Sequence, residues 1–71
     1  MNQPTIRYTV KAVRHVEAAA ELDGRTMVGK GSSREDSFYA LRNMVVQMLM
    51  HRGLMYAADD VGRTWKYVET E

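Results

Sequence analysis

The stretch from Ser33 to Gly53 constrains this chain most, because it carries both a start and a stop signal for one long helix. Ser33 is a favoured N-cap residue, and Asp36 makes a variant of the capping box and places negative charge in the first turn. At the other end His51 lies in the last turn, and Gly53 can take the positive φ of a C′ residue. The pattern predicts a helix over residues 34–52.

Apolar residues recur along this predicted helix at spacings of three and four, which is typical of a face that packs on a sheet. They are Phe38, Leu41, Val45, Met48 and Leu49. Residues 44–50 are apolar almost all the way round, with Gln47 the one polar residue among them. Two interpretations stay open: the C-terminal segment covers this end, or Met44, Val46 and Met50 stay exposed and contact a partner. In the second interpretation the partner can be another copy of this chain, which would form a homodimer.

From Ile6 onward apolar residues alternate with polar ones, which predicts a half-buried strand. The even positions carry Ile6, Tyr8, Val10, Ala12, Val16, Ala18, Ala20 and Leu22. A strand over residues 5–22 would be far longer than usual, so we expect a bend near Arg14 and His15. The helix propensity of this region leaves a rival interpretation, in which residues 13–22 include a short helix.

Two further strands are predicted after the helix, at residues 54–58 and 64–68, with a turn around Asp59, Asp60 and Gly62. Before it, Asp23-Gly24 favours a type I′ hairpin turn into a strand over residues 25–30. The predicted fold is therefore α+β, with the layout ββαββ. It is a single domain, 1–71, in which one small antiparallel sheet packs on a single helix.

Residues typical of catalysis are not grouped in this sequence. His15 and His51 are far apart, and neither has carboxylates at metal-ligand spacing. The chain has no cysteine, which excludes disulfides and thiolate metal sites and is typical of a cytoplasmic protein. Residues 29–33 are glycine-rich and lead into a helix N-terminus, the general geometry of an anion site, but lack P-loop spacing. We expect no enzymatic activity, no metal and no cofactor.

Charge is nearly balanced, at a net +1, but the first 34 residues hold six Lys or Arg against three Asp or Glu. This basic front half predicts contact with an anionic partner through Arg7, Lys11, Lys30 and Arg34. Apolar runs stay well short of the about 20 residues of a membrane span, and the first ten residues lack the apolar stretch of a leader. We expect a cytoplasmic protein without membrane contact.

The C-terminal segment is rich in residue types found at interface hot spots. Trp65 and Tyr67 would lie on one face of the predicted last strand and Lys66 on the other, with Arg63 beside them. The alternative for the two aromatic residues is that they supply the core of this small domain. The predicted partner-binding residues are Met44, Met50, Arg63, Trp65, Lys66 and Tyr67.

Residues 59–67 resemble the late Asp-x-x-Gly-Arg-x-Trp hairpin of some anti-CRISPR proteins, which are small phage-encoded inhibitors of bacterial defence. Some short members of this class place a single helix on an antiparallel sheet. The resemblance implies a protein without chemistry of its own, which docks on a host nucleic-acid-handling complex and blocks it.

Residues 16–45 also resemble the second half of a double-stranded RNA-binding domain. The shared features are a strand-turn-strand unit, the motif Gly29-x-Gly31-x-Ser33-Arg34 and a following helix. Arg34 takes the place of the first lysine of that family, whereas Glu35 and Phe38 replace its other lysines. This resemblance implies, as the alternative function, direct contact with RNA.

Overall fold

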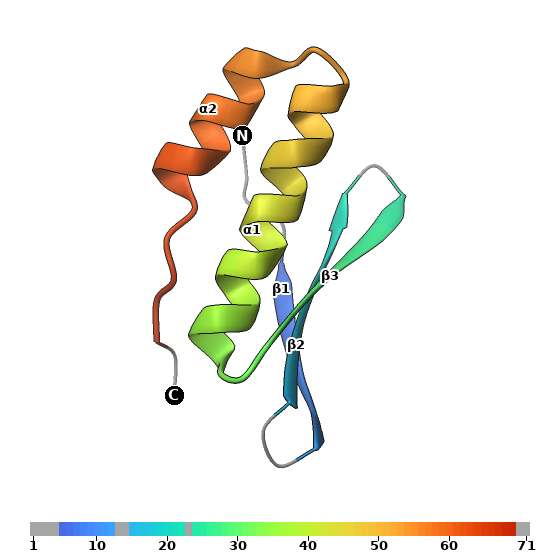
Figure 1. Cartoon of the computed structure of the whole chain (residues 1–71), viewed down its shortest axis with the longest axis vertical. Helices are drawn as coiled ribbons and strands as arrows, with labels where there is room; N and C mark the ends of the chain where they lie inside the picture. Colours follow the sequence, from blue (N-terminus) through green and yellow to red (C-terminus); the bar gives the residue numbers. More distant parts are fainter. Residues whose placement is uncertain (1–4, 13–14, 23, 70–71) are drawn as a thin grey trace.

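The computed structural model describes residues 5–12, 15–22 and 24–69, and the structural statements that follow refer to these residues. The elements are β1 (Ile6–Ala12), β2 (His15–Leu22), β3 (Arg25–Gly31), α1 (Arg34–His51) and α2 (Met55–Thr64). The strands form one antiparallel sheet in the order β1-β2-β3. Both helices lie on the same side of this sheet (Figure 1). The predicted α+β class is confirmed, whereas the predicted layout ββαββ is wrong, since the order is βββαα.

The alternation predicted for the first third of the chain is present, but in two strands instead of one. Its even positions face one another across β1 and β2, as Ile6 with Ala20, Tyr8 with Ala18, and Val10 with Val16. The prediction is wrong for Ala12, which pairs with His15 because the register shifts after Val10. Ala18 and Ala20 are fully buried beneath the helical layer. Residues 15–22 are therefore a strand, and the rival helix is excluded for them, because alternation outweighed the helix propensity of alanine.

The chain reverses its direction between Ala12 and His15, where the sequence predicted only a bend. The register of β1 against β2 shifts between Val10 and Ala12, so the irregularity falls at Lys11. Arg14, the other residue named for the bend, lies outside the described residues.

The hairpin between β2 and β3 follows the prediction in the part that is described. Leu22 pairs with Arg25, which leaves a two-residue connection. Gly24 has a φ of 76°, and a type I′ turn requires a positive φ at its second central position. Asp23 lies outside the described residues.

Helix α1 begins and ends at the predicted signals. The backbone N–H of Asp36 donates a hydrogen bond to the Ser33 hydroxyl at 3.1 Å, so Ser33 is the N-cap. Arg52 is the C-cap, and Gly53 follows with a φ of 75°. The helix thus ends at His51, one residue before the predicted end.

Helix α1 lies unusually close to β3, because two glycines of that strand face it. A Cβ atom added to Gly29 would lie 2.2 Å from the backbone nitrogen of Leu41. One added to Gly31 would lie 2.6 Å from the backbone nitrogen of Ser37. These residues form a strand beneath a helix and not the exposed loop of an anion site. Packing explains both glycines.

Helix α2 replaces the two predicted C-terminal strands, and both of those predictions are wrong. Ala58, Val61 and Trp65 recur at spacings of three and four, and all three are buried. Helix α2 packs mainly against α1 (Figure 1). Residues 65–69 follow without regular secondary structure. The turn predicted around Gly62 lies inside the helix.

Arg42 connects the two helices. Its guanidinium donates to the carbonyl oxygens of Trp65 at 3.3 Å and Gly62 at 3.5 Å, at the C-terminal end of α2. A cation at this position stabilises the last carbonyls and the helix dipole. The same group lies 4.7 Å from the ring centroid of Tyr39. This role could not be predicted without α2.

Replacement of Gly62 by alanine should stabilise the protein. Gly62 has no neighbour within 4 Å of an added Cβ, and its φ is not positive. Alanine in a helix interior is favoured over glycine by about 0.5–1 kcal/mol, which corresponds to a rise in Tm of roughly 2–8 °C. Thermal unfolding followed by circular dichroism measures this. The matched variant Gly53→Ala, placed at a φ of 75°, should lower Tm; a lower Tm for Gly62→Ala would contradict the helical assignment.

Candidate functional site

The sheet has one open face, on the side away from the helices (Figure 1). We call it the open sheet face, and the pairing of the strands assigns to it Arg7, Thr9, His15, Glu17, Ala19, Glu21, Thr26, Val28 and Lys30. Lys11, at the shift in register, joins this face through its ion pair with Glu17. Within residues 5–69, no described element packs over it. Its charged groups are accordingly accessible to a partner.

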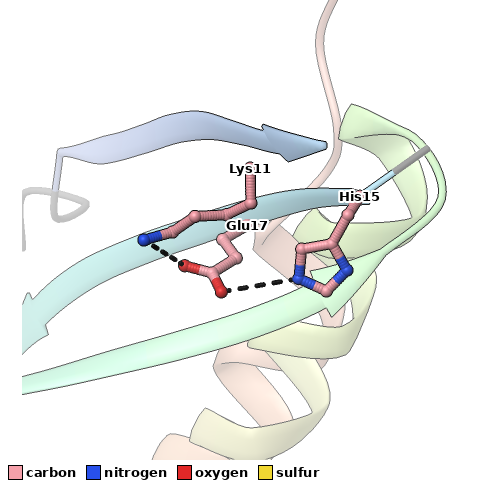
Figure 2. Close-up of polar contacts among 3 residues, drawn as sticks. All are labelled: Lys11, His15 and Glu17. Carbon is pink, nitrogen blue, oxygen red and sulfur yellow. Dashed lines mark ion pairs between the residues drawn. The ribbon is translucent and has the colours of Figure 1, made fainter. Parts of the chain in front are cut away.

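Three of these residues form a polar cluster around Glu17 (Figure 2). The two carboxylate oxygens of Glu17 lie 3.9 Å from Lys11 Nζ and 3.5 Å from His15 Nε2. The Glu17 side chain is 20% exposed, whereas Lys11 is 57% exposed. Because the carboxylate offsets the charge of Lys11, the face is less positive than its basic residues alone suggest.

The four basic residues predicted to meet an anionic partner do not share one surface. Arg7, Lys11 and Lys30 lie on the open sheet face. Arg34 is the first residue of α1, and its guanidinium lies 5.7 Å from the ring centroid of Tyr8, on the helix side of the sheet. The structure therefore brings three of the four together and separates Arg34 from them.

The predicted partner-binding set is divided as well. Trp65 is only 6% exposed and belongs to the core, so its alternative role in packing is the one found. Lys66 and Arg63 are exposed. Arg63 lies 3.8 Å from Asp59, in an ion pair so exposed that it adds little stability.

Tyr67 holds residues 65–69 against the rest of the chain. Its ring centroid lies 6.5 Å from that of Tyr8 in β1 and 5.8 Å from that of Phe38 in α1. Its hydroxyl donates a hydrogen bond to the Glu69 carboxylate. This bond favours the neutral phenol and, with burial, raises the pKa of Tyr67 to about 12. Burial also raises the pKa of Tyr8, against the opposing effect of Arg34.

The raised pKa of Tyr67 predicts a loss of stability in alkali. The unfolded chain loses this proton near pH 10 and the folded chain only near pH 12, so the stabilisation is present below pH 10 and disappears as pH rises to about 12. Across this window the free energy of unfolding should fall more for the wild type than for Tyr67→Phe. Urea unfolding at each pH measures the difference. Tyr56→Phe, on a ring 90% exposed, is the control and should follow the wild type; parallel pH profiles for wild type and Tyr67→Phe would contradict the assignment.

Each interpretation of residues 44–50 holds in part, with Val46 covered against the second and Met44 and Met50 exposed against the first. Val45 is buried, while Val46 and Leu49 pack against the core that α2 completes. Met44 and Met50 remain 43% and 41% exposed. Being six positions apart, they lie about 120° apart around the helix, so they do not form one surface together.

A different apolar surface lies where α1 turns into α2. We call it the helical-turn patch, and it consists of Met50, Leu54, Met55 and Tyr56, which are 41%, 49%, 54% and 90% exposed. Sequence reasoning identified only Met50, because residues 54–58 were predicted as a strand. Part of the signal was available in the helical spacing of Ala58, Val61 and Trp65, since Tyr56 lies opposite this core side of the helix.

Comparison with known proteins adds no relative. No family model matches the chain, no curated protein matches it, and no solved structure matches the fold. Among the described residues, no group of three or more His, Cys, Asp or Glu side chains could hold a metal ion. In that same part of the chain, no helix is long and apolar enough to cross a membrane.

Proposed function

We propose that this chain is a non-enzymatic module that acts in the cytoplasm by occupying a surface of a partner protein. The observation that carries the proposal is the helical-turn patch, in which four large apolar side chains stay exposed within seven residues, Met50 to Tyr56. Contiguous exposed apolar side chains mark interaction sites, and methionine and tyrosine are enriched there. Methionine also adapts its shape to a partner.

In its specific form, the proposal is inhibition of a host nucleic-acid-handling defence complex, as the resemblance of residues 59–67 to anti-CRISPR proteins implies. Residues 59–64 belong to α2 and do not form a hairpin, so the resemblance supports this form through its sequence alone. A second support is the docking surface at the start of the same helix. A protein that acts by occupancy needs such a surface and no catalytic group.

The general proposal is tested by capturing partners from bacterial lysate, purifying the captured protein and measuring its affinity for three chains. Met55→Ser combined with Tyr56→Ser should weaken binding at least about tenfold, because loss of two buried apolar anchors costs more than about 1.4 kcal/mol. Val68→Ser removes a 71% exposed apolar side chain elsewhere and should bind like the wild type. Equal affinities for all three chains would overturn the helical-turn patch as the docking surface.

The specific form is tested in bacteria whose CRISPR system rejects a targeted plasmid. Expression of the wild type and of Val68→Ser should restore transformation by that plasmid, and the Met55→Ser, Tyr56→Ser variant should not. If hosts with each of the main effector types still reject the plasmid when they express the wild type, inhibition of defence is refuted. The docking test does not depend on this result.

The alternative function is direct contact with double-stranded RNA. The observation that favours it is the placement of Arg7, Lys11 and Lys30 on the open sheet face. Phosphate contacts make such binding steeply salt-dependent. In a gel shift at low salt, Arg7→Glu with Lys30→Glu should abolish a complex that Arg34→Glu, on the other side of the sheet, leaves intact. No RNA complex with the wild type would exclude this function.

A further inference from the structure

The sheet ends in two edges that differ in how well they are covered. β2 is the central strand, so β1 and β3 each have an outer edge that no described strand pairs. α1 packs mainly on β3 and β2, and Gly29 of β3 is buried beneath it. Unpaired backbone N–H and C=O groups along an edge are a template for another strand. β1 is the more accessible of the two.

The helix-side residues of β1 are only partly covered within the chain. Ile6 and Tyr8 are half-buried, and Tyr67 contacts the ring of Tyr8. Val10, on the same side of the strand, is 64% exposed. A strand added at this edge would extend the apolar side of the sheet over Val10. The edge therefore offers apolar side chains as well as backbone groups.

The sequence of β1 favours a second copy of itself as that strand. In a two-fold antiparallel pair centred on Arg7, this residue would face its own copy. Centred on Thr9, the pair would bring Arg7 next to Lys11, at the irregularity in β1. Like charges directly opposite each other destabilise a sheet.

Centred on Tyr8, the pairing has no such conflict. Ile6 then faces Val10 of the second copy, so the exposed valine meets an aliphatic side chain. Arg7 faces Thr9 on the open sheet face. Among the registers centred on Arg7, Tyr8 and Thr9, only the one centred on Tyr8 sets apolar side chains opposite apolar ones while keeping basic side chains away from each other.

We propose that two copies of this chain pair through β1, antiparallel about Tyr8, and join their sheets into one continuous sheet. This interface does not involve the helical-turn patch, so it is independent of the proposed function. The dimer would place two open sheet faces side by side and leave both helical-turn patches free.

The test exploits the predicted opposition of Arg7 and Thr9. Thr9→Arg sets two pairs of arginines opposite each other and should weaken dimerisation about tenfold or more. Arg7→Glu, mixed in equal amount with Thr9→Arg, sets Glu against Arg and should restore the dimer. Thr26→Arg makes the same change on the same face of the other edge strand, and it should dimerise like the wild type. The three variants have exposed substitutions on the same sheet face, so they leave the core intact.

Light scattering after size exclusion, at rising concentration, reads the mass of each sample. The wild type and Thr26→Arg should approach twice 8.1 kDa, Thr9→Arg should stay near 8.1 kDa, and the mixture should return to the dimer mass. A wild type that is monomeric at millimolar concentration would overturn the proposal. So would a dimer that survives Thr9→Arg, or one that is lost only in the Met55→Ser, Tyr56→Ser variant.

Discussion

Gly29→Ala should leave this protein largely unfolded. The added Cβ would lie 2.2 Å from the Leu41 nitrogen, 2.5 Å from the Ser37 carbonyl oxygen and 2.7 Å from the Leu41 Cα, all of them backbone atoms that no rotamer change can move. Helix α1 would have to lift from β3 and expose Leu41, which is fully buried. We expect a cost of at least about 4 kcal/mol, against a total stability of about 4–11 kcal/mol for a chain of this length.

Urea unfolding and a two-dimensional amide NMR spectrum of the variant would measure this. Gly24→Ala is the matched control, because its Cβ would meet no atom within 4 Å and only its φ of 76° opposes the change. That backbone conformation costs about 1–2 kcal/mol for alanine, so the control should remain folded. A Gly29→Ala protein as stable as the control would show that α1 does not lie against β3 in this way.

Trp65→Ala should be the second most damaging of the changes considered. The ring is 6% exposed and belongs to the same core cluster as Leu41 and Val61. Truncation of a buried tryptophan costs about 3–5 kcal/mol through lost burial and the cavity left behind.

Urea denaturation of two alanine variants separates this role in packing from a role in partner binding. Tyr56→Ala removes a ring that is 90% exposed and should change the free energy of unfolding by no more than about 0.5 kcal/mol. A small effect for Trp65→Ala, similar to that of Tyr56→Ala, would mean that Trp65 is not part of the core.

Elements with local signals were predicted well. Ser33 and Gly53 fixed the bounds of α1 within a residue, because capping depends on the residues next to the helix end. The alternation from Ile6 to Val10 and from Val16 to Leu22 predicted which residues share the inner face, since it depends only on the pleat of a strand. The reversal between Ala12 and His15 had no comparable local signal among the described residues.

Helix α2 was missed because its formation depends on tertiary packing. Asp59, Asp60 and Gly62 are typical of turns, and Thr64 to Val68 has strand propensity. These local preferences were outweighed by the burial of Ala58, Val61 and Trp65 against α1. The error carried over to the site. A predicted surface strand placed Trp65 and Tyr67 at an interface, whereas the helix buries Trp65 and exposes Tyr56.

The order in which the elements pack has a consequence for how fast the chain folds. β1 pairs with β2, β2 with β3, β3 packs under α1, and α1 packs on α2, so most partners are neighbours along the chain. Contacts between elements that are close in sequence favour fast folding, because little loop-closure entropy is lost before they form. The contact of Tyr67 with Tyr8 spans almost the whole sequence. We therefore expect residues 65–69 to dock last, onto a sheet and helices that have already formed.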